Sequence, residues 1–371
     1  MAGFSLNSIT SFFTNFANDR SGSVVGIDIG SSAIKVVQLR RDHGKAILET
    51  YGAIALGPYG EVDVGRATQL PTEAVVRALN DVLREANITA KDAALSIPYA
   101  ASLVSVIKVP RVPERQLASM IPIEARKYIP VPIAEVLLDW YAIPDPSKTA
   151  TDEKENSTHM NVLLVAIHND TIAKYQTIVK DAELSASFFE IEVFSTVRSS
   201  LEHGIAPVAV LDMGASSTKL YLSERGVIRE SHIINRGGQD ITLAISQGLG
   251  IPGTKAEEEK RLRGLSDPAQ EKLIQSIHLT LEPILSEVNR IILAYETHMQ
   301  ASISKLVVTG GGATLKGLDE LLKQKLSTPV ERAHPFAKTE APAFLADVLN
   351  DAGPEFSVAV GLALRRLQEL S

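Results

Sequence analysis

The chain has no cysteine among its 371 residues, which excludes disulfide bonds, thiolate catalysis and cysteine-ligated metal sites. Its eight histidines lack the spacing of a metal-ligand cluster. Basic residues are not in excess either, and the net charge of −7 argues against nucleic acid as the main partner. The uncharged interior stretch 93–107 is too short to span a membrane and contains Pro98. These absences favour a globular protein of a reducing cytoplasm.

One sequence pattern occurs twice. Residues 24–39 read VVGIDIGSSAIKVVQL, and residues 208–223 read VAVLDMGASSTKLYLS. Each copy is an apolar, strand-like run that ends in Asp-x-Gly, followed by small hydroxyl residues and by a lysine seven positions after the aspartate. Two related units in one chain predict two similar half-domains that face each other across a cleft.

The residue types of each copy suit a phosphate group. Backbone N–H groups of a Gly/Ser turn can converge on an anion, and hydroxyl and ammonium groups add further donors. An aspartate at the strand end would repel phosphate unless a cation lies between them, which suggests Mg²⁺ held largely through water. A single copy would equally fit an ordinary β-hairpin with a D-x-G turn. The predicted phosphate residues are Gly30, Ser31, Ser32, Lys35, Gly214, Ser216, Ser217 and Lys219, and the predicted metal residues are Asp28 and Asp212.

Apolar periodicity predicts an α/β fold with a three-stranded antiparallel meander in each half. The expected meander strands cover 24–29, 34–41 and 46–56 in the first half, and 208–223 and 226–234 in the second. An α/β unit between them has no counterpart later in the chain. Its helix, expected over 113–128, should be kinked or divided by Pro122. Residues 145–159 lack apolar periodicity and are predicted to form a mobile loop.

These elements predict a division of the chain into six parts. They are a tail or docking helix (1–21), a first lobe (22–92), an inserted α/β subdomain (93–191), a connecting helix of the first lobe (192–206), a second lobe (207–345) and closing helices (346–371).

The order of the motifs over residues 22–371 resembles the actin-like ATPase superfamily, and within it the PilM family of type IV pilus assembly. The segment 124–132, EARKYIPVP, carries the resemblance to that family, since the other motifs occur across actin-like relatives. The resemblance implies a two-lobed actin-like fold with duplicated ribonuclease-H-like halves and an α/β subdomain inserted in the first lobe. It also implies ATP and Mg²⁺ as ligands.

Three further groups of residues acquire a role from this resemblance. The run AEEEK at 256–260 would by itself be a solvated helix face. The resemblance implies that Glu257 binds ribose hydroxyls and that Lys260 lies along the base. Gly310, Gly311 and Gly312 would let adenine lie against the backbone, and Gly238 would donate to the phosphates.

The resemblance implies a cytoplasmic ATP-binding adaptor that is peripheral at the inner membrane through protein partners. Its partner would be the cytoplasmic N-terminal peptide of a PilN-like membrane protein, gripped between the first lobe and the insert. We also consider contacts with pilus motor ATPases and self-association. Two alternatives stay open. An FtsA-like division scaffold should carry a basic amphipathic helix beyond the closing helix, and a small-molecule kinase should have a catalytic acid in a substrate pocket.

Hydrolysis of ATP requires a group that orients the attacking water. The helix before the second turn offers Glu192, Ser195 and Thr196, and the sequence does not decide which of them faces the cleft. We therefore expect hydrolysis to be slow or absent.

A partner surface is expected in the insert. Leu117, Met120 and Ile121 are neighbours on its predicted helix, and the strand 103–109 is apolar on both faces. An extended apolar peptide could bind there. The alternative is that these side chains fill the small core of the insert itself.

Overall fold

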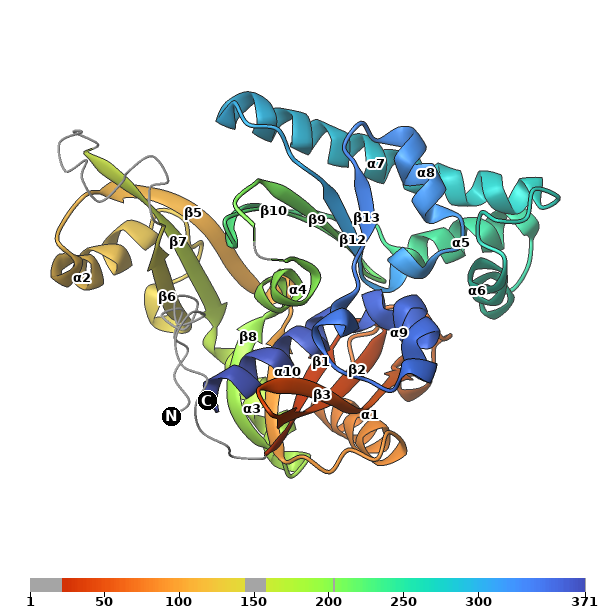
Figure 1. Ribbon diagram of the computed structural model, residues 1–371, viewed down its shortest axis with the longest axis horizontal. Coiled ribbons are helices and arrows are strands. Elements are labelled where there is room, and N and C mark those ends of the chain that lie inside the picture. Colours follow the sequence, from red (N-terminus) through yellow and green to blue (C-terminus); the bar gives the residue numbers. More distant parts are fainter. Residues whose placement is uncertain (1–21, 144–157, 203, 371) are drawn as a thin grey trace.

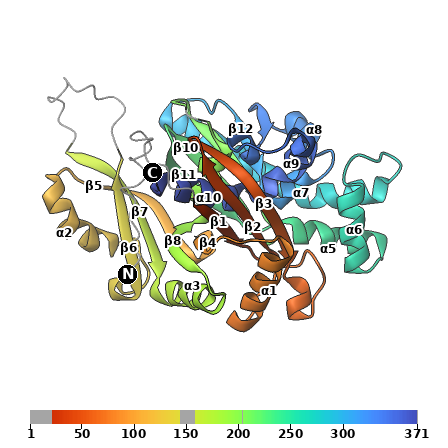
Figure 2. The same ribbon diagram turned by 60° about the horizontal axis from the view of Figure 1, so that its bottom comes forward.

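The computed structural model describes residues 22–143, 158–202 and 204–370. The predicted N-terminal docking segment and nearly all of the predicted 145–159 loop lie outside the described residues. Figures 1 and 2 show two lobes and a smaller insert, with the insert at one end of the molecule and the helices α5 (Gly238–Leu249) and α6 (Gly253–Leu262) at the other.

The first lobe is built on a five-stranded sheet of order β3-β2-β1-β4-β8. Its strands are β1 (Ser23–Ile29), β2 (Ala33–Asp42), β3 (Lys45–Ala55), β4 (Asp92–Ile97) and β8 (Ser185–Ile191). The first three are antiparallel, and β4 and β8 continue the sheet in parallel.

Both faces of this sheet are buried because alternate residues of β1 and β2 are apolar on each side. Val25 and Ile27 pack with α1 (Thr72–Glu85) and α3 (Asn169–Asp181). Val24 and Val37 pack on the other face against α10 (Ser357–Glu369). The closing helix therefore forms part of the core of the first lobe.

The second lobe repeats this arrangement. Its sheet has the order β11-β10-β9-β12-β13, with β9 (Val208–Met213), β10 (Thr218–Glu224), β11 (Val227–Ile234), β12 (Leu306–Thr309) and β13 (Val330–Arg332). The first three strands are antiparallel and the last two are parallel to β9. Four helices accompany it, namely α5 (Gly238–Leu249), α6 (Gly253–Leu262), α7 (Glu271–Met299) and α8 (Leu318–Lys325). The predicted duplication of a three-stranded meander is thus confirmed.

The insert has a three-stranded sheet of its own, in the order β5-β7-β6. It contains β5 (Ser102–Pro110), α2 (Glu114–Ala125), β6 (Val136–Ala142) and β7 (His159–His168). The expected range 93–191 is wider than this sheet, because β4 and β8 at its two ends pair into the first lobe. Parallel pairing joins segments that are far apart in the chain, so local sequence pattern did not reveal it.

The position of helix α2 decides whether its apolar side chains form a partner surface or the core of the insert. Leu117 and Ile121 are fully buried against β5 and β7, so the alternative that these side chains fill the core of the insert is confirmed for both. Met120 packs partly against the same cluster. The other face of β5 contributes Val104 to the core of the first lobe, which explains why this strand is apolar on both faces. α2 is also not divided at Pro122 and ends three residues later.

The two lobes meet below the cleft. The short helix α4 (Glu192–Ser200) packs against α10, and the ring of Tyr99 lies 6.0 Å from that of Tyr221 in the second lobe. The hydroxyls of Tyr99 and Ser231 are 2.5 Å apart. Helix α9 (Ala346–Ala352) and a 3-10 turn (Gly353–Phe356) lead directly into α10. Among the described residues, no helix has both the length and the hydropathy required to cross a membrane.

Candidate functional site

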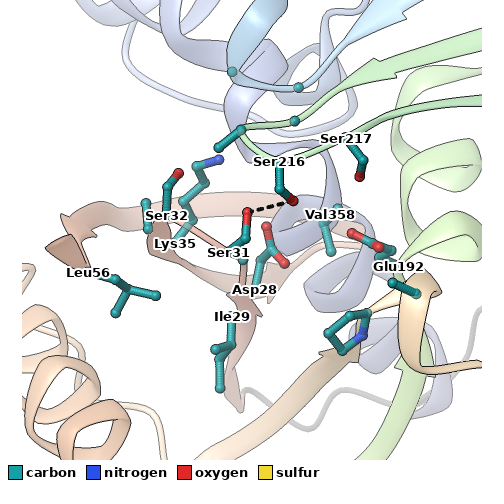
Figure 3. A pocket seen from close by; sticks show the side chains of 18 of the residues that line it. Asp28, Ile29, Ser31, Ser32, Lys35, Leu56, Glu192, Ser216, Ser217 and Val358 are labelled. Atoms are coloured by element: carbon teal, nitrogen blue, oxygen red, sulfur yellow. Dashed lines mark hydrogen bonds between the residues drawn. The ribbon is translucent and has the colours of Figure 1, made fainter. Parts of the chain in front are cut away.

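The two predicted turns face each other across one cavity of about 470 Å³ between the lobes. The Oγ atoms of Ser31 and Ser216, one from each turn, are 3.2 Å apart (Figure 3). The predicted residues that line the cavity are Asp28, Gly30, Ser31, Ser32, Lys35, Asp212, Gly214, Ser216, Ser217, Lys219, Gly310 and Gly311. Ten residues selected from the sequence pattern and two assigned through the resemblance therefore share one cleft.

Both turns have the same backbone geometry. The N–H of Gly30 donates to Ala33 O, and the N–H of Gly214 donates to Ser217 O, each at 3.0 Å. The strand register places Lys35 directly opposite Asp28, and Lys219 opposite Asp212. The spacing of seven residues between aspartate and lysine thus makes them cross-strand partners on the cleft face.

The two lysines have different surroundings. Lys219 is buried, and its Nζ lies 2.9 Å from Glu192 Oε2 and 3.4 Å from Asp212 Oδ2. Burial alone would lower the pKa of Lys219, but these two carboxylates raise it well above its usual value. Lys35 has no hydrogen-bond or ion-pair partner within the described residues. Of the two lysines in the turns, Lys35 is therefore the one whose ammonium group remains available to an anion in the cleft.

Asp28 is an anionic group held away from water. Its Oδ1 accepts a hydrogen bond from Ser96 Oγ at 2.9 Å. Burial raises the pKa of Asp28 to about 6, partly offset by the positive charge of Lys35. A cation bound near this carboxylate would remove the cost of burying its charge.

The carboxylates fit Mg²⁺ bound mainly through water. Asp28, Asp212 and Glu192 all line the cavity. In the part of the chain that the structure describes, no three His, Asp or Glu side chains are grouped closely enough to hold a metal ion directly. Mg²⁺ keeps several of its waters and commonly binds through one or two carboxylates together with phosphate oxygens. The water-mediated Mg²⁺ site at Asp28 and Asp212 stays a prediction.

Helix α4 presents two polar side chains to the cleft. Glu192 and Thr196 line the cavity, whereas Ser195 points away and donates to Glu190. The carboxylate of Glu192 is already engaged, since Tyr99 N–H donates to its Oε1 at 2.6 Å and Lys219 binds its Oε2. Figure 3 shows Glu192 beside the two turns. Of the three side chains that the sequence offered for orienting a water, Glu192 and Thr196 therefore line the cleft, and Glu192 is the acidic one.

Three of the nucleotide-binding residues implied by the resemblance, Glu257, Lys260 and Gly238, lie outside the cavity lining. Glu257, Lys260 and Gly238 form a cluster of their own in α5 and α6. Glu257 is buried and accepts from Thr242 Oγ1 at 2.6 Å, from Lys260 Nζ at 2.6 Å and from Arg261 Nε at 2.7 Å. Lys260 Nζ also donates to Gly238 O at 3.0 Å. The structure brings these residues together with each other, but not into the cavity of the phosphate turns.

The glycine-rich turn after β12 reaches the cleft. Gly310 has a φ of +82°, and a Cβ there would lie 2.4 Å from Asp212 Oδ1, so the turn requires glycine. Gly311 lines the cavity, and a Cβ on it would meet no atom closer than 3.9 Å. Gly312 instead packs against Met213 and does not line the cavity.

Some lining residues were not selected from the sequence. Lys174 and Tyr175 come from α3, and Glu355 and Ser357 come from the start of the closing helices. They carry no local motif, because only the folded arrangement of distant elements brings them to the cleft.

Two sheets of the same strand order, joined over a cleft lined by paired D-x-G turns, define a two-lobed actin-like protein. EutJ from Carboxydothermus hydrogenoformans has this fold, with a TM-score of 0.56, 15% identity, and coverage of 93% of this chain and 90% of that one. MreB5 of Spiroplasma citri bound to ADP matches with a TM-score of 0.51 and 11% identity, over 94% and 98% of the two chains.

A match to a protein family classifies the chain more narrowly than its fold does. The family described as type IV pilus assembly protein PilM matches residues 26–367, and the chain belongs to this family. A solved PilM-PilN type IV pilus biogenesis complex has a TM-score of 0.77 and 26% identity, over 92% of this chain and 98% of that chain.

Curated relatives include FtsA cell division proteins. The one from Pseudomonas aeruginosa is 27% identical over 188 residues, which cover 44% of this chain and 43% of that protein. The one from Staphylococcus epidermidis strain RP62A is 24% identical and aligns with 82% of this chain and 73% of its own length. The chain thus spans less than half of the first of these relatives.

Proposed function

We propose that this protein is an ATP- and Mg²⁺-binding adaptor of a type IV pilus assembly platform, or of a related secretion or competence system. The observation that carries the nucleotide part is the pair of matching turns with Ser31 and Ser216 3.2 Å apart in one cavity. Solved relatives of the same fold include MreB5 of Spiroplasma citri bound to ADP and to AMPPNP.

Each group in the cleft has a role in this proposal. The turn N–H groups, the serine hydroxyls and Lys35 would bind the phosphates. Asp28 and Asp212 would hold hydrated Mg²⁺, which supplies charge neutralisation to the triphosphate when it is bound. Gly310 and Gly311 would lie under adenine, and Glu257 and Lys260 would contact ribose and base once they are accessible.

We expect hydrolysis to be slow or absent because Glu192 already binds two partners. Its carboxylate holds Lys219 and accepts from Tyr99 N–H, so it has little freedom to orient a water. Nucleotide would then act mainly as a ligand that stabilises one arrangement of the lobes.

The partner of this adaptor would be the cytoplasmic N-terminal peptide of a PilN-like membrane protein. The likeness to a PilM-PilN complex over nearly the whole chain supports this partner. Such docking would place a cytoplasmic protein peripherally at the inner membrane. Because Leu117 and Ile121 are core residues, we assign the contact to exposed apolar side chains of the insert such as Ile123 and Tyr128.

The partner is tested by capture on the immobilised N-terminal peptide of the PilN-like protein from the same organism. We expect saturable binding that a scrambled peptide does not reproduce. Incubation with Mg·ATP and candidate sugars or carboxylic acids tests the kinase alternative. Stoichiometric phosphorylated product would contradict the adaptor proposal.

A further inference from the structure

The segment between β3 and α1 contacts both lobes, and Thr68 and Gln69 at its end line the cleft. We call residues 61–69 the strap. On the side of the first lobe it is tied to the first phosphate turn, because Thr68 N–H donates to Ser31 O at 2.8 Å. At the start of the same connection, Leu56 N–H donates to Ser32 O at 2.8 Å and Tyr59 Oη donates to Asp81 Oδ2 at 2.5 Å. The strap is therefore anchored to the turn that the proposed phosphate site uses.

The strap also contacts the second lobe. The N–H of Ala67 donates to Gln239 Oε1, in the first turn of α5, at 3.2 Å. A Cβ on Gly253, at the start of α6, would lie 2.9 Å from Asp63 Oδ2. These contacts are made by residues that lie some 170 positions or more away from the strap in sequence.

The strap comes closest to Glu257, the residue predicted to bind ribose. Gly65 has a φ of +90°, and a Cβ there would lie 2.6 Å from Cδ of Glu257 and 2.8 Å from both carboxylate oxygens. The backbone of Gly65 thus covers the Glu257 carboxylate. This contact accounts for the exclusion of Glu257 from the cavity, which instead has Thr68 and Gln69 of the strap in its wall.

A continuous series of hydrogen bonds joins the two phosphate turns through the strap. Ser31 O accepts from Thr68 N–H, Ala67 N–H donates to Gln239 Oε1, and Gln239 N–H donates to Ala215 O of the second turn at 3.0 Å. A change at either turn can therefore be transmitted to the strap through residues in direct contact.

We propose that the strap is a latch between the lobes that occupies the ribose side of the cleft and must leave Glu257 when a nucleotide binds. This inference rests on the proposed nucleotide function. Nucleotide and strap compete for one carboxylate, so binding releases the Gly65–Glu257 contact and loosens the link between the lobes. Nucleotide occupancy is thereby converted into a change of lobe separation.

The variant Gly65→Ala tests the latch by sterics. Its methyl group would collide with Glu257, and alanine also disfavours the positive φ. Gly226→Ala is the matched control, because Gly226 has a φ of +75° in the β10–β11 hairpin but no atom within 4 Å of an added Cβ. Stopped-flow association of a fluorescent N-methylanthraniloyl-ATP should be about tenfold faster in Gly65→Ala, as expected if about 1.4 kcal/mol of latch contact is lost. Gly226→Ala should associate at the wild-type rate.

The absence of cysteine allows the movement itself to be measured. Spin labels on Val64→Cys and Glu258→Cys, both exposed, report the distance from strap to α6 without background labelling. Without nucleotide we expect one narrow distance, and saturating Mg·ADP should shift it to longer values. Gly65→Ala introduced into the labelled protein should give longer distances even without nucleotide.

The outcomes separate the latch from the nucleotide function. An unchanged distance in labelled protein that binds Mg·ADP by calorimetry would overturn the latch and leave the nucleotide function standing. Equal association rates in Gly65→Ala and wild type would also overturn it, provided that both variants melt cooperatively. Failure of wild-type protein to bind either Mg·ADP or Mg·ATP would overturn the nucleotide function, and the latch with it.

Discussion

At the scale of single residues, Asp28 shows how a binding group can lower stability. Burial raises its pKa to about 6, so the ionised carboxylate that Mg²⁺ would require is disfavoured in the folded protein. The folded pKa lies above the unfolded value of 3.8, and folding therefore favours the protonated form. The ionised carboxylate therefore lowers the free energy of unfolding above pH 6, and this destabilisation disappears as the pH falls towards 4.

We expect Asp28→Asn to raise the free energy of unfolding at pH 7 by about 1–3 kcal/mol, because one pKa unit corresponds to about 1.4 kcal/mol. The gain should shrink progressively between pH 6 and pH 4. Urea denaturation of both proteins across this range measures it. A gain that was constant with pH would show that the ionisation of Asp28 is not its cause.

We expect substitution of Lys219 to affect stability and substitution of Lys35 to affect nucleotide binding. Lys219→Met should destabilise the protein by about 3–5 kcal/mol, because it leaves Glu192 and Asp212 buried without their partner. Lys35→Met should change stability by less than about 1 kcal/mol while weakening Mg·ATP binding roughly tenfold or more. Thermal melts and calorimetry of the two variants side by side test this difference. Equal loss of stability in both would refute the assignment of distinct roles.

Gly311 offers a steric test of the base site. A Cβ added to Gly311 would meet no protein atom closer than 3.9 Å, and Gly311 lines the cavity. Gly311→Val should therefore weaken ATP and ADP alike, by about tenfold or more, with little change in melting temperature. Competition binding with both nucleotides tests this, and Gly310→Val, which collides with Asp212, serves as the unstable comparison.

At the scale of elements, the sequence predicted most strands and helices because their apolar periodicity is strong. The meander strands fall where the pattern placed them. The limits of the insert and the fate of Leu117 and Ile121 could not be predicted, since both depend on which distant strands pair and cover α2. An apolar stripe on a helix predicts burial, but it does not distinguish a core from a partner site.

Helix α2 supplies a matched pair for the partner surface. Ile121 is buried and Ile123, two residues later, is 61% exposed. Ile121→Asp should lower stability by about 4 kcal/mol or more because it buries an unpaired charge. Ile123→Glu should leave the melting temperature almost unchanged and reduce capture of the PilN-like peptide. If several exposed positions of the insert tolerate charge without loss of capture, the insert is not the docking surface.

At the scale of the whole molecule, the cleft is a product of duplication. Each half supplies a turn of the same geometry, yet the surroundings have diverged, and only the first lysine remains without an ion pair in the described residues. The sequence identified both turns from residue types alone. It could not identify the Glu192–Lys219 pair or the strap contacts, which join residues brought together only by the docking of the two lobes.

The most direct test of this account is a calorimetric titration of Mg·ATP into the wild-type protein and into Asp28→Ala and Asp212→Ala. We expect one site per chain in the wild type. Each variant should lose about tenfold to a hundredfold in affinity, since a lost charge-assisted contact costs about 1.5–3 kcal/mol. Unchanged affinity in both variants, or no binding to folded wild-type protein, would contradict the assignment of the cleft as a nucleotide site.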